Sequence, residues 1–101
     1  MDFHTSIITP SGRAFDGKVS ALSAPGVAGG FGVLAGHAPL LAGLRNGALK
    51  ITQSGKDYYF SIAQGILEVN HEHNCLILCD RASSAASLEE AENASKEFKN
   101  N

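Results

Sequence analysis

Apolar and polar side chains alternate over several short stretches of the chain, which is the pattern of half-buried β-strands. Between residues 48 and 53, Leu49 and Ile51 alternate with Lys50 and Thr52. Most of these stretches end at glycine, proline, serine or asparagine, the residues that favour tight turns. The predicted strands cover residues 3–9, 13–15, 18–23, 40–44, 48–53, 58–62, 66–69 and 75–79, with a glycine-hinged strand before a tight loop at 36–37.

Turns are predicted at residues 10–12, 16–17, 46–47, 54–57 and 70–74. Asn46-Gly47 carries the strongest hairpin signal, because both residue types tolerate positive φ. Short strands with a turn about every eight to twelve residues are typical of a sandwich or barrel, and no strand alternates with a long helical stretch. The predicted fold class is mainly β: an antiparallel β-sandwich of about ten short strands followed by a short C-terminal α-helix.

The composition changes after Asp80, where residues 82–86 are only alanine and serine and predict a flexible linker. Ser87 and Glu90 then form a capping box, which marks the start of a helix. A helix of about 12 residues is marginal alone, so it must dock or fray. Its thin stripe consists of Leu88, Ala91, Ser95 and Phe98, and Lys96 and Lys99 are expected at its negative end. We therefore divide the chain into a β-sandwich domain, 1–82, and a linker with a short helix, 83–101.

Residues 24–47 are apolar but are interrupted by glycine and proline, which excludes a helix. A loop that is both apolar and glycine-rich is more often a docking surface than a solvated connector. His37 lies in this loop. Of its two interpretations, a contact with a partner is favoured over a histidine that only bonds its local backbone.

Length and charge limit the partners and the compartment. The chain has 101 residues and a net charge of −2, and its scattered lysines and arginines form no basic patch of the kind that binds nucleic acid. No apolar run reaches the ~18 residues of a membrane helix, and residues 1–4 do not begin a secretory signal. We expect a cytoplasmic protein that associates with a membrane only through a partner.

Cysteine and histidine define the one metal hypothesis. Cys75 and Cys79 lie ~13 Å apart on the same predicted strand, too far to pair, and are interpreted as small buried hydrophobes. His71, His73 and Cys75 alternate along the chain, which would place three zinc-type donors on one face of a strand. A turn is predicted between them and a fourth ligand is missing, so a polar hairpin tip is favoured and no metal is predicted.

Cofactor binding and catalysis have little support in the sequence. The letters Gly30-x-Gly32-x-x-Ala35 match a dinucleotide fingerprint, but no helix follows and no acid lies at the required distance. No G-x-S-x-G elbow accompanies the serines and histidines. We predict no cofactor and no catalytic residue.

The stretch Gly-Phe-Gly-Val-Leu-Ala-Gly-His-Ala-Pro-Leu-Leu, starting at Gly30, resembles a signature of the ε subunit of bacterial F-type ATP synthases. Other landmarks agree in order, over roughly residues 3–82: Thr9-Pro10, Phe15-Asp16-Gly17, Ala24-Pro25-Gly26, Gly65-Ile66-Leu67-Glu68-Val69 and Asp80. The resemblance implies a non-catalytic central-stalk subunit of a rotary proton-translocating ATP synthase. Such a subunit packs on the γ (gamma) subunit and on the polar loops of the c-ring, and couples their rotation to ATP synthesis.

The resemblance also implies contact residues. Those expected at the c-ring are Gly30, Phe31, Gly36 and His37, and those expected at the γ subunit are Ala38, Pro39, Leu40 and Leu41. The family usually has an acid where this chain has Gly30 and a proline where it has Ala35. The alternative interpretation is a stand-alone β-sandwich that binds a ligand or metal, which zinc analysis of the purified protein would distinguish.

The tail departs from the family most. The family continues into a two-helix hairpin, and this sequence stops inside the expected first helix, through truncation or by nature. Some members have a nucleotide motif, I/L-D-x-x-R-A, at the start of that helix. Here Glu92 replaces its basic residue and would repel phosphate. We expect a coupling element and not a nucleotide-controlled inhibitor.

Overall fold

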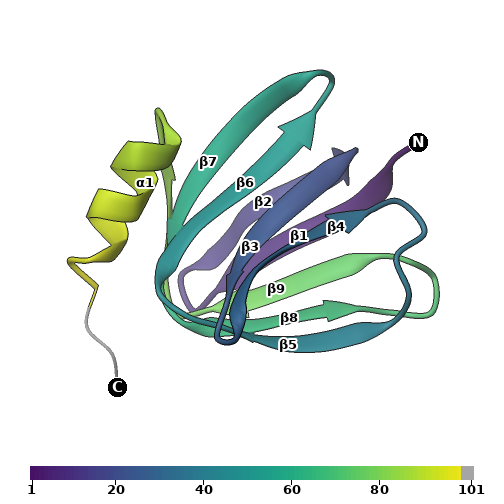
Figure 1. Cartoon of the computed structure of the whole chain (residues 1–101), viewed down its shortest axis with the longest axis horizontal. Coiled ribbons are helices and arrows are strands. Elements are labelled where there is room, and N and C mark those ends of the chain that lie inside the picture. Colours follow the sequence, from purple (N-terminus) through teal and green to yellow (C-terminus); the bar gives the residue numbers. More distant parts are fainter. Residues whose placement is uncertain (99–101) are drawn as a thin grey trace.

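The computed structural model describes residues 1–98 as strands packed in two layers, with one helix outside them (Figure 1). The strands are β1 (Phe3–Thr9), β2 (Gly12–Val19), β3 (Ala21–Gly26), β4 (Gly29–Leu34), β5 (Leu40–Leu44), β6 (Gly47–Gln53), β7 (Lys56–Ile62), β8 (Gly65–Val69), β9 (Cys75–Cys79) and β10 (Ala82–Ala85), and the helix is α1 (Leu88–Ser95). The predicted fold class is confirmed. No helix within residues 1–98 has the length and apolar character needed to cross a membrane.

The strands follow the order β10-β7-β6-β3-β5-β8-β9-β1-β2, and β4 pairs with the other edge of β3. The register of β3 and β5 joins only Gly26 and Leu44, so the sheet bends sharply there. One layer therefore contains β10, β7, β6, β3 and β4, and the other contains β5, β8, β9, β1 and β2. The described pairs are antiparallel except β1 with β9, which run parallel from Thr5↔Cys75 to Ile8↔Leu78.

The core lies between the layers and consists of the inward-facing aliphatic side chains of both. Each such side chain contributes about 1.5–3 kcal/mol by leaving water. The predicted alternation in β6 is confirmed, because Leu49 and Ile51 are fully buried. The largest fully buried aliphatic side chains are Ile7, Leu44, Leu49, Ile51, Ile62, Leu67 and Ile77.

The predicted turn at 16–17 is wrong, because β2 runs straight through it. Asp16 pairs with Ser6 and Gly17 with Thr5 in the β1–β2 register. The Asp16 carboxylate bonds to side chains on the exposed face of the β1–β2 hairpin, and Asp16 is not part of a turn. The chain bends instead at Ser20, so the predicted strand over 18–23 is split between β2 and β3.

Asn46-Gly47 is not a hairpin, because β5 and β6 pair with other strands. Asn46 has a different role: its Oδ1 accepts from the Gln64 N–H at 2.7 Å and its Nδ2 donates to the Phe98 carbonyl at 3.2 Å. A tight hairpin turn does occur between β6 and β7, where Ser54 and Gly55 have φ of 52° and 77°. The predicted turn at 54–57 is thus confirmed in place, and shorter.

The segment predicted as a flexible linker is a strand instead, since β10 pairs with β7. The small side chains predicted flexibility, but residues 82–85 instead pair with the edge of β7. The division of the chain at residue 82 stays a prediction.

The helix is confirmed, though α1 is shorter than expected. Ser87 Oγ accepts from the Glu90 N–H at 3.1 Å, while Glu90 reaches back to the Ala86 N–H at 3.0 Å. α1 docks on β6 and β7 with Ala91 and Ser95 buried, and Ser61 Oγ donates to the Ala91 carbonyl at 2.7 Å. The expected role of Lys99 lies outside the described residues.

Candidate docking surfaces

The glycine-rich stretch forms β4, a turn and then β5. Gly29 and Gly36 have φ of 130° and 79°, which other residues rarely adopt, so these glycines shape the two ends of β4. The predicted tight loop at 36–37 is confirmed: the His37 N–H donates to the Leu34 carbonyl at 3.1 Å.

The residues expected at the c-ring lie along β4 and its turn. Gly30 and Gly36 are exposed, and Phe31 is half-buried against the core. A Cβ on Gly26 would lie 2.9 Å from the Phe31 ring, so this ring packs directly on the bare backbone of β3. His37 is half-buried; its Nδ1 lies 2.7 Å from the Ala38 carbonyl, and His73 Nδ1 lies 3.0 Å from the His37 carbonyl.

The residues expected at the γ subunit follow directly. Ala38 and Pro39 are exposed, Leu40 packs partly against the core, and Leu41 is 71% exposed. Leu40 therefore anchors the start of β5, while Leu41 projects away from the core.

A second apolar surface, on β8, β9 and β1, was not predicted from the sequence. The β-sheet register places Ile66 beside Leu78 and Leu78 beside Ile8, across β8, β9 and β1. Ile66 also stands opposite Gly43, where the Val27 side chain comes within 3.4 Å of a Cβ built on the glycine. We call Val27, Ile66, Leu78 and Ile8 the apolar row. The uninterrupted apolar run 75–79 was the available signal, since such runs indicate strands with two apolar faces.

Carboxylates border this apolar row. Leu78 and Asp80 line two neighbouring depressions of 270 and 360 Å³. A third, of 300 Å³, lies between Leu41 and Glu68. A partner that covers the apolar row meets negative charge at its border.

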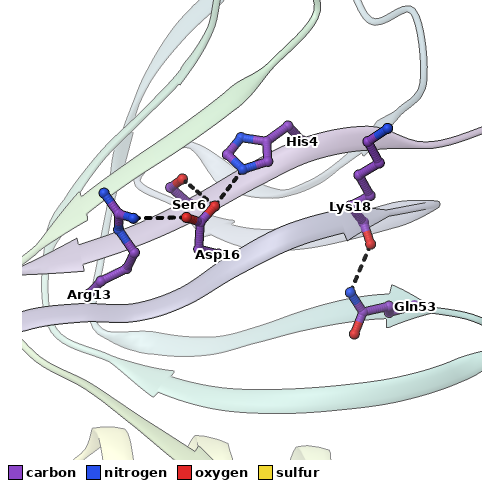
Figure 2. A network of polar contacts seen from close by, with 6 residues as sticks. All are labelled: His4, Ser6, Arg13, Asp16, Lys18 and Gln53. Carbon is purple, nitrogen blue, oxygen red and sulfur yellow. Dashed lines mark hydrogen bonds and ion pairs between the residues drawn. The ribbon is translucent and has the colours of Figure 1, made fainter.

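A polar cluster lies on the exposed face of β1 and β2 (Figure 2). Ser6 Oγ donates to Asp16 Oδ1 at 3.2 Å, Arg13 Nη1 pairs with Asp16 Oδ2 at 2.9 Å, and His4 Nε2 contacts Asp16 Oδ1. Partial desolvation of Asp16 is outweighed by the bonds from Ser6 and His4 and by the charges of His4 and Arg13, so its pKa is lowered. Ser6 and His4 meet the same carboxylate oxygen and not each other, so His4 is not placed as the base of a serine nucleophile.

A second contact in this view joins the two layers, where Gln53 Nε2 donates to the Lys18 carbonyl at 2.8 Å (Figure 2). This hydrogen bond joins the end of β6 to the end of β2, two residues after Asp16.

The donors of the metal hypothesis are not brought together. His71 and His73 are exposed in the turn after β8, and Cys75 is buried in β9. Within residues 1–98, no group of three histidine, cysteine or carboxylate side chains is arranged to hold a metal. Burial raises the pKa of Cys75 to about 12 and that of Cys79 to about 11, so both thiols stay protonated and unreactive near neutrality.

These features define a class of protein: a small β-sandwich whose outer faces, with their exposed aliphatic side chains, are suited to contact with other polypeptides. Residues 2–85 match the family described as ATP synthase, Delta/Epsilon chain, beta-sandwich domain, and the chain belongs to this family. The resemblance drawn from the sequence is thereby confirmed.

Individual relatives agree. The chain is 43% identical over 89 residues to an ATP synthase epsilon chain of Afipia carboxidovorans, covering 88% of this chain and 65% of that one. It is 40% identical over 90 residues to the epsilon chain of Nitrobacter winogradskyi, covering 89% and 66%. The chain thus spans a little under two thirds of the length of these relatives.

Solved structures share the fold. A chain of the Euglena gracilis mitochondrial ATP synthase, in a structure of OSCP/F1/c-ring, superposes with a TM-score of 0.78 at 24% identity, over 82% of this chain and 53% of that one. A chain of the Tetrahymena thermophila mitochondrial ATP synthase central stalk/c-ring gives 0.70 at 21% identity, over 82% and 66%.

Proposed function

We propose that this chain is a non-catalytic central-stalk subunit of a rotary ATP synthase, which couples rotation of the c-ring and γ subunit to ATP synthesis. The observation that carries the proposal, beside the family, is the apolar row. Aliphatic side chains this exposed are rarely aligned across neighbouring strands unless a partner covers them. Leu78 is 41% exposed, Ile66 45% and Val27 69%.

The physical demand on such a subunit is stiffness. Torque is transmitted only if the body between two contacts does not deform, and close-packed cores have low compressibility. The two layers supply this rigidity, because their core aliphatic side chains are fully buried. Hydrogen bonds also join segments that are not paired strands: Gln53 links β6 to β2, and Asn46 links to Gln64 and Phe98.

We assign the apolar row and the neighbouring residues Ala38, Pro39, Leu40 and Leu41 to the γ subunit. Gly30, Phe31, Gly36 and His37 are assigned to the c-ring, because they lie along β4 and the turn that follows it. The protein would then lie at the cytoplasmic side of the membrane, as a peripheral subunit held by its partners.

Binding to a purified γ subunit tests the assignment of the apolar row. Ile66→Asp places a carboxylate in its centre, beside Leu78, and we expect binding at least tenfold weaker. Tyr58→Asp is the matched control: Tyr58 is also 45% exposed but lies on β7 in the other layer. If both variants bind γ as tightly as wild type, the assignment fails.

The tail is proposed not to act as a nucleotide-controlled inhibitor. Glu92 is half-buried on α1 where the family motif has a basic residue, and a carboxylate there repels phosphate. Calorimetric titration of the chain with ATP should show no binding at millimolar concentrations. Binding at those concentrations, or strong inhibition of the ATPase on adding the chain, would contradict this part of the proposal.

A further inference from the structure

One carboxylate, that of Glu68, lies inside the surface assigned to the γ subunit. Ile66 and Glu68 are exposed on β8 while Leu67 between them is fully buried, so both side chains leave the outer face of their layer. The register places Glu68 opposite Leu41 of β5 on one side and opposite Leu76 of β9 on the other. Glu68 is therefore a charged residue with aliphatic neighbours on three sides.

A partner that covers both assigned parts of this face also covers Glu68. Ile66, in the apolar row, lies two residues from Glu68, which is about 7 Å along a strand. Leu41, in the neighbouring part, is directly opposite Glu68, and such cross-strand pairs have Cβ atoms about 4.5–5.5 Å apart. Because Glu68 adjoins both residues, a γ surface that packs on Ile66 and Leu41 removes water from its carboxylate.

The described part of the chain supplies no counter-charge for Glu68. Within residues 1–98, its carboxylate forms no ion pair and accepts no hydrogen bond. Asp16 on the same outer face differs, because Arg13 and His4 contact its carboxylate. His71, also among the described residues, lines the same depression of 300 Å³ as Glu68 but forms no ion pair with it. Taking an unpaired carboxylate out of water is strongly unfavourable, so a tight complex requires a cation from the partner.

We propose that a lysine or arginine side chain of the γ subunit pairs with Glu68 and makes this residue a determinant of partner specificity. The inference rests on the proposed function and names the chemistry of its contact. The depression beside Glu68 is also lined by Pro39 and Leu41, so its apolar wall leads to a carboxylate. Lysine and arginine have the matching form, an aliphatic stem that ends in a charged group. A partner without this cation would leave the carboxylate buried and unpaired.

The direction in which Glu68→Gln changes binding to purified γ tests the pairing in the full chain. Glutamine keeps the shape of the side chain and removes its charge, so the cation of γ would be left buried and unpaired. Binding should weaken about tenfold or more, mainly through faster dissociation. If γ brings no cation, the variant avoids the desolvation of a carboxylate and binds more tightly. If Glu68 stays in water, binding is unchanged. Either of these two results overturns the inference.

A matched control and a double-mutant cycle separate pairing from other effects of the substitution. Glu89→Gln removes the same charge from an exposed position on α1 and should leave γ binding unchanged. Each lysine and arginine of γ is then replaced by methionine, which keeps an apolar stem. One of these changes should weaken binding to wild type about tenfold or more and have little further effect on binding to Glu68→Gln. If the losses add for every lysine and arginine of γ, the pairing is refuted.

The proposed function and this inference fail in distinguishable ways. A wild-type chain that does not bind γ contradicts the proposed function, and the pairing with it. A wild-type chain that binds γ, and is weakened by Ile66→Asp but not by Glu68→Gln, contradicts the pairing alone.

Discussion

Replacing Thr5 by valine should stabilise the protein. Thr5 lies in the middle of β1 between Phe3 and Ile7, and its side chain is fully buried. Its Oγ1 is enclosed, and none of residues 1–98 offers it a hydrogen-bond partner. Valine has nearly the same shape and replaces this hydroxyl by a methyl group, so the perturbation removes one polar atom from the core and leaves the packing in place.

The magnitude follows from the desolvation of that hydroxyl. A buried donor left without a partner costs about 1–3 kcal/mol, which valine recovers. Since the side chain is fully buried, no solvent exposure reduces the effect. For a domain of this size, each 1 kcal/mol shifts the melting temperature by about 4–8 °C.

Urea unfolding measures the change. The midpoint should rise with an unchanged slope, because the surface exposed on unfolding stays the same. Thr5→Ser keeps the hydroxyl and removes the methyl group, so it should lose stability. Thr52→Val is the surface control, since Thr52 Oγ1 already donates to Asp57 at 2.7 Å. A Thr5→Val protein no more stable than wild type would refute the reasoning and indicate that the hydroxyl has a partner, such as an internal water.

Three further predictions concern protonation and packing. Because the pKa of Cys75 is raised to about 12 and that of Cys79 to about 11, the folded state keeps protons that the unfolded chain loses above about pH 9. The free energy of unfolding should therefore fall as the pH rises through that range, which urea melts at several pH values would show. The fall should be smaller in the variant with both Cys75→Ala and Cys79→Ala. The lowered pKa of Asp16 has the opposite sign: its contribution is present above the unfolded value of 3.8 and is lost on acidification, so Asp16→Asn should flatten the acid limb of the same profile. Gly65→Ala would drive a Cβ into the Leu78 carbonyl across the β8–β9 pair and should lower the free energy of unfolding by about 1–3 kcal/mol in thermal unfolding; an unchanged melting temperature would contradict the register.

The sequence predicted those parts of the fold that depend on local alternation. Leu49 and Ile51 are buried because each strand residue faces opposite its neighbour, a property of six residues alone. The prediction of a turn at Asp16-Gly17 was wrong because residues that favour turns are also tolerated inside a strand. Here the neighbouring strand β1 pairs with their main chain and supplies side-chain partners for the Asp16 carboxylate. The prediction of a linker at Ala82–Ala85 was wrong because this segment has no alternation of its own. It becomes a strand by pairing with the edge of β7.

The candidate surfaces were predictable to a different degree. The loop that contains His37 was predicted from its glycines, because glycine favours backbone conformations with positive φ such as that of Gly36. The apolar row was not, because Ile8, Ile66 and Leu78 meet only through the pairing of β1, β8 and β9. The assignment of individual residues to γ and to the c-ring stays a prediction.

The parallel pairing of β1 with β9 has a consequence for synthesis in the cell. β1 leaves the ribosome before the other described strands, yet Thr5 pairs with Cys75, which follows 70 residues later. At roughly 5–20 residues per second, β1 waits about 4–14 s for this neighbour. During that delay the edge of β1 that later pairs with β9 stays open. The layer that contains β1 therefore cannot close until β9 has been synthesised, and non-local closure of this kind makes folding slow. A nascent chain of this protein should therefore remain a client of ribosome-associated chaperones until β9 emerges.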